Sequence, residues 1–161
     1  MGRESRAAMP ASAIDVAKYL ILLAKSEEES ELLSPMQLQK LLYYTQGWSL
    51  ALRKEPMFDE RIEAWAYGPV VKEVFQAFRR FADGPINPDL GSDENLSDEQ
   101  KEFIGAVWQA YKGYSAIGLS EMTHREAPWK DARAGLPVGA RSNALISRKT
   151  LKEFFEKQSR K

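Results

Sequence analysis

The segment PMQLQKLLYYTQGWSLALR, residues 35–53, constrains the fold more than any other part of the sequence. Ser34 can cap a helix here, Pro35 suits its first position, and Gln37 can close a capping box. Apolar and small residues then recur at helical spacing, and others widen the buried surface: Leu38, Leu41, Leu42, Tyr43, Tyr44, Thr45, Trp48, Ser49, Leu50 and Leu52. Because so broad a surface must be covered by other elements, we predict that this helix is central. We expect Gly47 to allow a close helix crossing.

Most of the remaining chain also has helical patterns. Serines that can act as N-caps precede apolar residues at helical spacing, at Ser12, Ser97, Ser115 and Ser147. Outside the central segment these patterns predict helices over about residues 12–25, 69–81, 98–113, 115–122 and 147–155, with one more turn starting at Pro128. Residues 134–146 indicate a loop or extended chain.

Residues 58–67 have a different pattern. Two sets of residues alternate here: Ile62, Ala64 and Ala66, and between them Glu63, Trp65 and Tyr67. A period of two indicates an extended segment or short strand. Gly68 then supplies a turn that other residues resist, and Pro69 suits the first position of the next helix. We therefore predict a mainly α fold, a compact bundle of about six helices with a short extended or β segment around residues 58–67.

The length of 161 residues fits one domain, because two halves would each have a poor core. We expect residues 1–11 to form a disordered arm, residues 12–158 a single domain, and residues 159–161 a basic tail. The sequence contains no cysteine, which removes disulfides and zinc sites built on sulfur and suits a reducing compartment. No segment approaches the roughly 20 apolar residues of a membrane span, so we expect no membrane partner.

The charges balance, with 23 Lys and Arg against 23 Asp and Glu. A protein dedicated to nucleic acid usually carries a basic excess, because neutralising phosphates supplies much of its affinity. We therefore expect no nucleic-acid partner. The most acidic run comprises Glu27, Glu28, Glu29 and Glu31, and we interpret it as a solvated turn.

His124 is the one histidine, so any histidine-based chemistry must use it. A hydrolase would pair it with a serine such as Ser115 or Ser120, but no G-x-S-x-G elbow presents that serine. A metal site would need His124 with carboxylates such as Glu121 and Glu126, yet no H-E-x-x-H pattern is present, and no glycine-rich loop indicates phosphate binding. We predict a non-enzymatic protein without metal or cofactor, and we keep a hydrolase using His124 as a remote alternative.

Five aromatic residues have two interpretations: Tyr43, Tyr44, Trp65, Tyr67 and Trp129. Aromatic side chains are enriched at protein–protein hot spots, and two of these five flank the Gly68-Pro69 turn. Tyrosine and tryptophan also fill interiors when their polar atoms find partners, and we favour that interpretation. The residues alone thus predict a mainly helical, intracellular domain with a well-formed corner and no visible catalytic machinery.

Four segments together resemble a known family: LQKLLYYTQGWSLAL (38–52), PMFDERIEAWAYGPVVKEVFQAFRRF (56–81), LSEMTHREAPWKDAR (119–133) and ISRKTLKEFF (146–155). Their order and spacing are similar to the Panacea domain, also called the SocA-like antitoxin domain, over nearly the whole chain after residue 12. The phrases K-L-L-Y-Y-x-Q-G-W, A-W-x-Y-G-P-V and T-H-x-x-x-P-W are together specific. The motif residues that carry over are Lys40, Leu41, Tyr43, Gln46, Trp48, Trp65, Tyr67, Gly68, Pro69, Val70, Thr123, His124, Pro128 and Trp129.

The resemblance implies an antitoxin of a bacterial or phage-associated toxin–antitoxin pair, acting in the cytoplasm. Its partner would be a cognate toxin, encoded by a neighbouring gene and neutralised by direct binding. The alternative is a proteolytic adaptor that delivers the toxin to a ClpXP-type protease. A homodimer stays open, although no heptad or exposed stripe indicates one. Following the resemblance, we expect the partner to bind Tyr43, Trp65, Tyr67, Gly68, Pro69, Thr123, His124 and Trp129.

Overall fold

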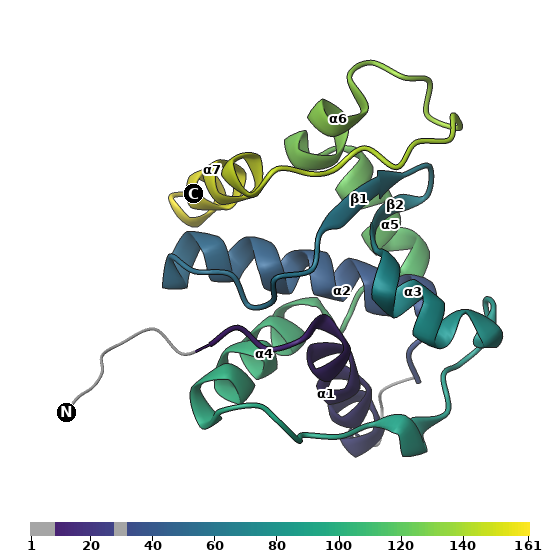
Figure 1. Ribbon diagram of the computed structural model, residues 1–161, viewed down its shortest axis with the longest axis vertical. Coiled ribbons are helices and arrows are strands. Elements are labelled where there is room, and N and C mark those ends of the chain that lie inside the picture. Colours follow the sequence, from purple (N-terminus) through teal and green to yellow (C-terminus); the bar gives the residue numbers. More distant parts are fainter. Residues whose placement is uncertain (1–8, 28–31) are drawn as a thin grey trace.

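A computed structural model of the chain describes residues 9–27 and 32–161. The helix α2, Pro35–Trp48, runs through the middle of the molecule and continues into a π-helical turn, η1, over Ser49–Arg53 (Figure 1). Every residue from Leu38 to Gly47 is buried. The prediction that this helix is central is therefore confirmed.

The other elements surround α2. Within the described residues their bounds are α1 Ala13–Ser26, β1 Ile62–Trp65, β2 Gly68–Val71, α3 Lys72–Phe78, η2 Arg79–Phe81, η3 Pro88–Leu90, α4 Asp98–Tyr111, α5 Ala116–His124, α6 Ala127–Arg133 and α7 Arg148–Ser159. Helices α1 and α4 pack on one side of α2 and α7 on the opposite side, while β2 and α5 also pack against it (Figure 1). The predicted mainly α fold with one short β segment is confirmed.

Serine caps begin five of these helices, as the sequence predicts. In each case the side-chain oxygen accepts the backbone N–H three positions later, at Ser12, Ser34, Ser97, Ser115 and Ser147. At Ser97 the capping box is complete, because the Gln100 side chain accepts from the Ser97 N–H. The Gln37 side chain, expected to close a second box, donates to the Tyr114 carbonyl instead.

The prediction that Pro69 begins a helix is wrong. Residues 68–71 form β2, which pairs antiparallel with β1, and α3 begins only at Lys72. Ala64 lies opposite Pro69 in this register, and its N–H donates to the Ala144 carbonyl on the other side of β1 at 2.8 Å. Pro69 therefore removes no hydrogen bond from the hairpin, and the valines that follow it favour a strand.

Buried amide side chains on α2 fix the backbone of residues 57–71. Gln46 accepts from the N–H groups of Met57 and Phe58 and donates to the Phe58 carbonyl at 2.8 Å. Gln39 accepts from the Val71 N–H at 2.7 Å and donates to the Val71 carbonyl at 3.1 Å. Because both amides use their donor and their acceptor, neither is left unsatisfied in the core. The segment is thus anchored to the central helix at both ends.

The expected close crossing at Gly47 is confirmed. A Cβ atom on Gly47 would overlap the ring of Phe155, which α7 brings against α2. The same ring packs edge-on against Tyr43, Tyr44 and Trp48, with centroid distances of 5.8, 5.9 and 5.0 Å. Edge-to-face contacts of this kind are favourable beyond the area that they bury. Helix α7 therefore closes the aromatic part of the core.

Parts of the chain that precede and follow α1 are described only in part. Of the expected arm, residues 1–8 lie outside the described residues, whereas Ala11 is buried and its N–H donates to the Met57 carbonyl at 2.9 Å. Of the acidic run, residues 28–31 lie outside the described residues. Glu27 accepts from Trp108 Nε1 at 3.2 Å and from Lys112 Nζ at 2.9 Å, which ties the end of α1 to α4.

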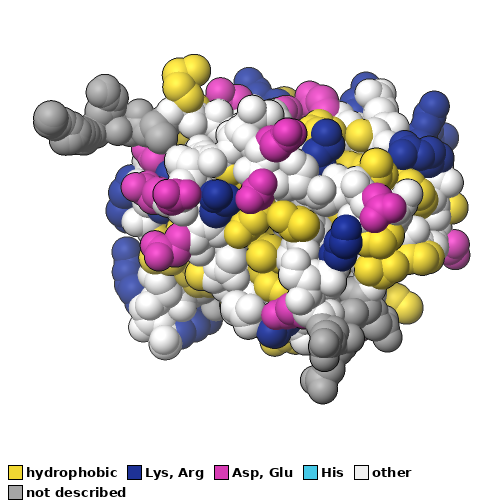
Figure 2. Space-filling view, turned by 90° about the horizontal axis from the view of Figure 1, so that it is seen from below, with side chains coloured by type: hydrophobic (Ala, Val, Ile, Leu, Met, Phe, Trp, Pro, Cys, Tyr) yellow, Lys and Arg dark blue, Asp and Glu magenta, His cyan; other side chains and the backbone are white. Residues whose placement is uncertain are grey.

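Figure 2 views the molecule from below relative to Figure 1, the side on which α1 and α4 lie. Basic and acidic side chains are interspersed across this face, with groups of hydrophobic atoms between them. This mixture agrees with the equal numbers of basic and acidic residues in the sequence. None of the described helices has the length and apolar character that crossing a bilayer requires.

Candidate partner-binding site

The turn between β1 and β2, residues 65–69, is called the corner below, and side chains of α2, α5 and α6 hold it. Three of its carbonyl oxygens accept hydrogen bonds from these side chains: Trp129 Nε1 to Trp65 O at 2.8 Å, Ser120 Oγ to Tyr67 O at 2.8 Å, and Lys40 Nζ to Pro69 O at 3.3 Å. Because alternate carbonyls are bonded, the backbone has little freedom to rearrange. The corner is thus a rigid platform.

Gly68 is required for this geometry. Its φ is +117°, a conformation that residues with a Cβ atom rarely adopt. A Cβ atom there would also lie 2.6 Å from Lys40 Cε and 3.1 Å from Thr123 Oγ1. Thr123 is buried and donates its hydroxyl to the Ser120 carbonyl at 2.7 Å. The expectation that Gly68 makes the turn is confirmed, and Thr123 supports the turn from within.

The two aromatic side chains of the corner differ in exposure. Tyr67 is 72% exposed. Trp65 is half-buried; its ring packs edge-on against Phe75 with centroids 4.9 Å apart, and its Nε1 donates to Glu63 Oε1 at 2.7 Å. Exposed aromatic side chains are enriched at protein–protein hot spots. Tyr67 is the more accessible of the two aromatic side chains of the corner.

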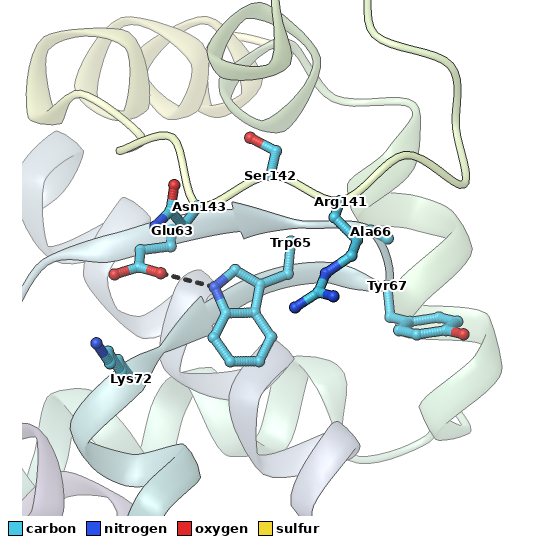
Figure 3. A pocket seen from close by; sticks show the side chains of 8 residues that line it. All are labelled: Glu63, Trp65, Ala66, Tyr67, Lys72, Arg141, Ser142 and Asn143. Carbon is cyan, nitrogen blue, oxygen red and sulfur yellow. Dashed lines mark hydrogen bonds between the residues drawn. The ribbon is translucent and has the colours of Figure 1, made fainter.

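An open groove of about 580 Å³ lies beside the corner (Figure 3). The corner and β1 form one wall, and residues 141–143 form another. Figure 3 shows the Arg141 guanidinium between the rings of Trp65 and Tyr67, with Lys72 on the other side of Trp65. Neither basic residue was among the predicted site residues, and no local pattern indicates that residues 141–143 return to the hairpin.

Arg133 brings that loop back to the hairpin. It is buried, and its guanidinium donates at 2.6–3.2 Å to the carbonyls of Ala64, Pro137, Val138 and Ala140. The guanidinium carbon also lies 4.7 Å from the centre of the Trp129 ring, a cation–π distance. Beyond the loop, the Ile146 N–H donates to the Ile62 carbonyl at 2.8 Å. One buried arginine therefore positions the second wall of the groove.

His124 stacks on Trp129, with ring centroids 4.2 Å apart and planes 28° apart. Its Nε2 is buried and has no hydrogen-bond partner among the described residues. Burial, and then the charges of Lys40 and Arg133, lower the pKa of His124. Of the two candidate nucleophiles of a hydrolase, Ser120 donates its hydroxyl to a corner carbonyl and Ser115 caps α5. This geometry favours a packing role for His124. Among the described residues, no group of His, Asp and Glu has the arrangement of a metal site.

Glu126 has a role that the sequence did not indicate. Its Oε1 accepts from the Tyr43 hydroxyl at 2.8 Å, and its Oε2 accepts from the Tyr44 hydroxyl at 3.0 Å. Burial raises the pKa of Glu126 to about 7, although the two hydroxyls favour the charged form. Both tyrosines are buried, so they hold the start of α6 and do not line the groove. A contact across more than eighty residues of sequence has no local signal.

The fold and the corner together define a helical domain with a preorganised aromatic surface. The family model described as antitoxin SocA-like, Panacea domain, matches residues 38–130. That is more than half of the chain, and this protein belongs to that family. The matched region contains nearly all of α2, the corner and the Thr123–Trp129 segment, whereas α7 lies beyond it. The resemblance drawn from the motifs is confirmed over residues 38–130. The comparisons with curated proteins and with solved structures found no match.

Membership of a family of antitoxins implies a toxin as the partner and suggests a non-enzymatic role.

Proposed function

We propose that this protein is an antitoxin that binds its cognate toxin directly, in the cytoplasm, and that the corner makes the contact. Membership of the antitoxin SocA-like family supports the class of function. The observation that carries the placement is the exposed Tyr67 on a backbone bonded to Ser120, Lys40 and Trp129. A surface that is ordered before binding loses little conformational entropy on association, and tyrosine is enriched at hot spots.

The expected site residues then divide into two groups. We assign Tyr67 and Trp65 to direct contact, because they face solvent or the groove. We assign the others to shaping or supporting the corner: Tyr43, Gly68, Pro69, Thr123, His124 and Trp129. Substitutions in the supporting group would weaken neutralisation through the fold, whereas a substitution of Tyr67 would act through the contact alone.

The test is coexpression in bacteria with the product of the neighbouring gene, recording growth and capturing the complex. Tyr67→Ala should raise the Kd by about tenfold or more and reduce growth, because a hot-spot aromatic is removed. The matched control is Tyr114→Ala, another exposed tyrosine (46%), which lies outside the groove. It should bind like the wild type. Thermal unfolding of both variants checks that each still folds.

Each outcome decides one part of the proposal. If the wild type neither restores growth nor forms a complex, the protein is not an antitoxin of that toxin. If Tyr67→Ala stays folded and binds as tightly as the wild type, the contact lies elsewhere. Restored growth with a falling toxin level and no stable complex would replace direct neutralisation by delivery to a protease.

A further inference from the structure

Two basic side chains of the groove have no acidic partner in the part of the chain that the structure describes. Arg141 and Lys72 both line it, and neither forms an ion pair within residues 9–27 and 32–161. Some basic side chains outside the groove do pair; Lys54, for example, lies 2.9 Å from Glu156. Among the described residues that line the groove, the acidic one is Glu63, which accepts a hydrogen bond from the neighbouring indole. The groove therefore has more basic than acidic side chains in its described lining, beside aromatic surface.

We propose that the groove binds an acidic segment of the partner, with Arg141 and Lys72 contacting its carboxylates. This inference rests on the proposed function, because it names the chemistry that the toxin presents to the corner. A guanidinium can donate two parallel hydrogen bonds to one carboxylate, and a lysine ammonium adds a point charge. The two cations lie on opposite sides of the Trp65 indole (Figure 3). Two acidic side chains separated by an apolar one fit this arrangement.

The backbone beside Arg141 is fixed in both directions. The Ala140 carbonyl accepts from Arg133 Nη2 at 2.6 Å, and the Ala144 carbonyl accepts from the Ala64 N–H at 2.8 Å. The loop that carries the guanidinium therefore loses little freedom when a carboxylate binds. The backbone is therefore held in place in both walls of the groove, in the corner and beside Arg141.

Side-chain recognition fits the groove better than addition of a strand. On the outer edge of β2, the Pro69 carbonyl already accepts from Lys40, and both backbone groups of Val71 are bonded to Gln39. A peptide strand would find these groups occupied. Nucleic acid is also disfavoured, because the groove carries two basic and one acidic side chain and the sequence has no net charge. An acidic protein segment is therefore the occupant that the charges favour.

The first test measures toxin binding by calorimetry at low and high salt. Arg141→Glu and Lys72→Glu should each raise the Kd by about tenfold or more, because they place like charges against the partner. The salt dependence of binding should also become smaller in both variants. The matched control is Lys149→Glu, the same charge reversal at an exposed position of α7 outside the groove. Its Kd should stay close to that of the wild type.

The second test needs no toxin. The ¹⁵N-labelled protein is titrated with a synthetic peptide of alternating Glu and Leu, then with its Lys and Leu counterpart, and then with a single-stranded oligonucleotide. We expect the acidic peptide to shift the Trp65 indole N–H resonance in the wild type and not in Arg141→Glu. No shift with the acidic peptide, or a larger shift with the oligonucleotide, would overturn the inference.

The two tests separate this inference from the proposed function. If Tyr67→Ala weakens toxin binding but Arg141→Glu and Lys72→Glu do not, the protein is an antitoxin, and the inference that the groove binds an acidic segment is wrong. If the wild type binds no toxin, the proposed function fails and the peptide titration alone decides the inference.

Discussion

Lys40 should make the stability of this protein depend on pH in an unusual direction. Lys40 is 1% exposed. Within the described residues, its ammonium donates a hydrogen bond to the Pro69 carbonyl. Burial lowers the pKa of Lys40 from 10.5 to about 7. Between these values the unfolded chain binds more protons than the folded chain. The free energy of unfolding should therefore rise as the pH rises from 7 towards 10.5.

The magnitude follows from the same two pKa values. A tenfold change in proton affinity corresponds to about 1.4 kcal/mol, so holding the charged form in the core costs roughly 5 kcal/mol below pH 7. Lys40→Met keeps an unbranched side chain and removes the charge, but it also removes the hydrogen bond to Pro69, worth about 1–2 kcal/mol. We therefore expect the variant to be about 3 kcal/mol more stable than the wild type at pH 6. Near pH 10 it should be slightly less stable.

Urea unfolding of both proteins at pH 6, 8 and 10 checks this expectation. The raised pKa values of the buried tyrosines affect the wild type and the variant alike. Besides burial, the Lys40 charge also lowers the pKa of His124, so the change between pH 8 and pH 10, where that imidazole is neutral, isolates Lys40. Lys130→Met, at an exposed position of α6, is the control and should leave the pH dependence unchanged. If the curves of the wild type and Lys40→Met run parallel from pH 6 to 10, the reasoning about burial is wrong.

Two further predictions concern the core. Gly47→Ala should destabilise the protein by about 3 kcal/mol or prevent folding, because the new methyl group would overlap the Phe155 ring. Gly105→Ala, where nothing lies within 4 Å, should stabilise α4 by about 0.5–1 kcal/mol; equal effects of the two changes in thermal unfolding would contradict the close crossing. Burial raises the pKa of Glu126 to about 7 from 4.5, so the folded chain binds more protons in that window and stability should fall as the pH rises through it. Glu126→Gln should remove this slope in urea unfolding between pH 4 and 7, and an unchanged slope would count against the assignment.

Local signals in the sequence located most helix starts. A serine N-cap accepts a hydrogen bond from the backbone N–H three residues later, so its effect depends on the local sequence. Ser12, Ser97 and Ser147 therefore begin helices as predicted, whatever packs around them. The prediction for Pro69 was wrong because its conformation depends on contacts beyond the local sequence. Its placement in β2 depends on pairing with the neighbouring strand β1 and on the bonds of Gln39 to the end of β2. Gln39 lies 32 residues before Val71, so the local sequence around Pro69 does not indicate these bonds.

The candidate site was only partly accessible to sequence reasoning. The motifs pointed to the corner, but they did not distinguish Tyr43, which is fully buried, from Tyr67, which is exposed. Both are tyrosines in motif segments, and burial is set by the helices that pack around them. The second wall of the groove was missed because Arg141 reaches it through a loop that Arg133 folds back. The identity of the contact residues stays a prediction.

The bonds that anchor residues 57–71 have a consequence for engineering. Main-chain atoms of this segment form hydrogen bonds with side chains from other parts of the fold: Gln39, Lys40, Gln46, Ser120 and Trp129. Anchoring of this kind does not depend on which side chains stand at positions 65 and 67. A library that randomises these two positions should therefore keep its shape, as a display scaffold does. Changing these two residues could give the domain new binding specificities while its fold stays the same.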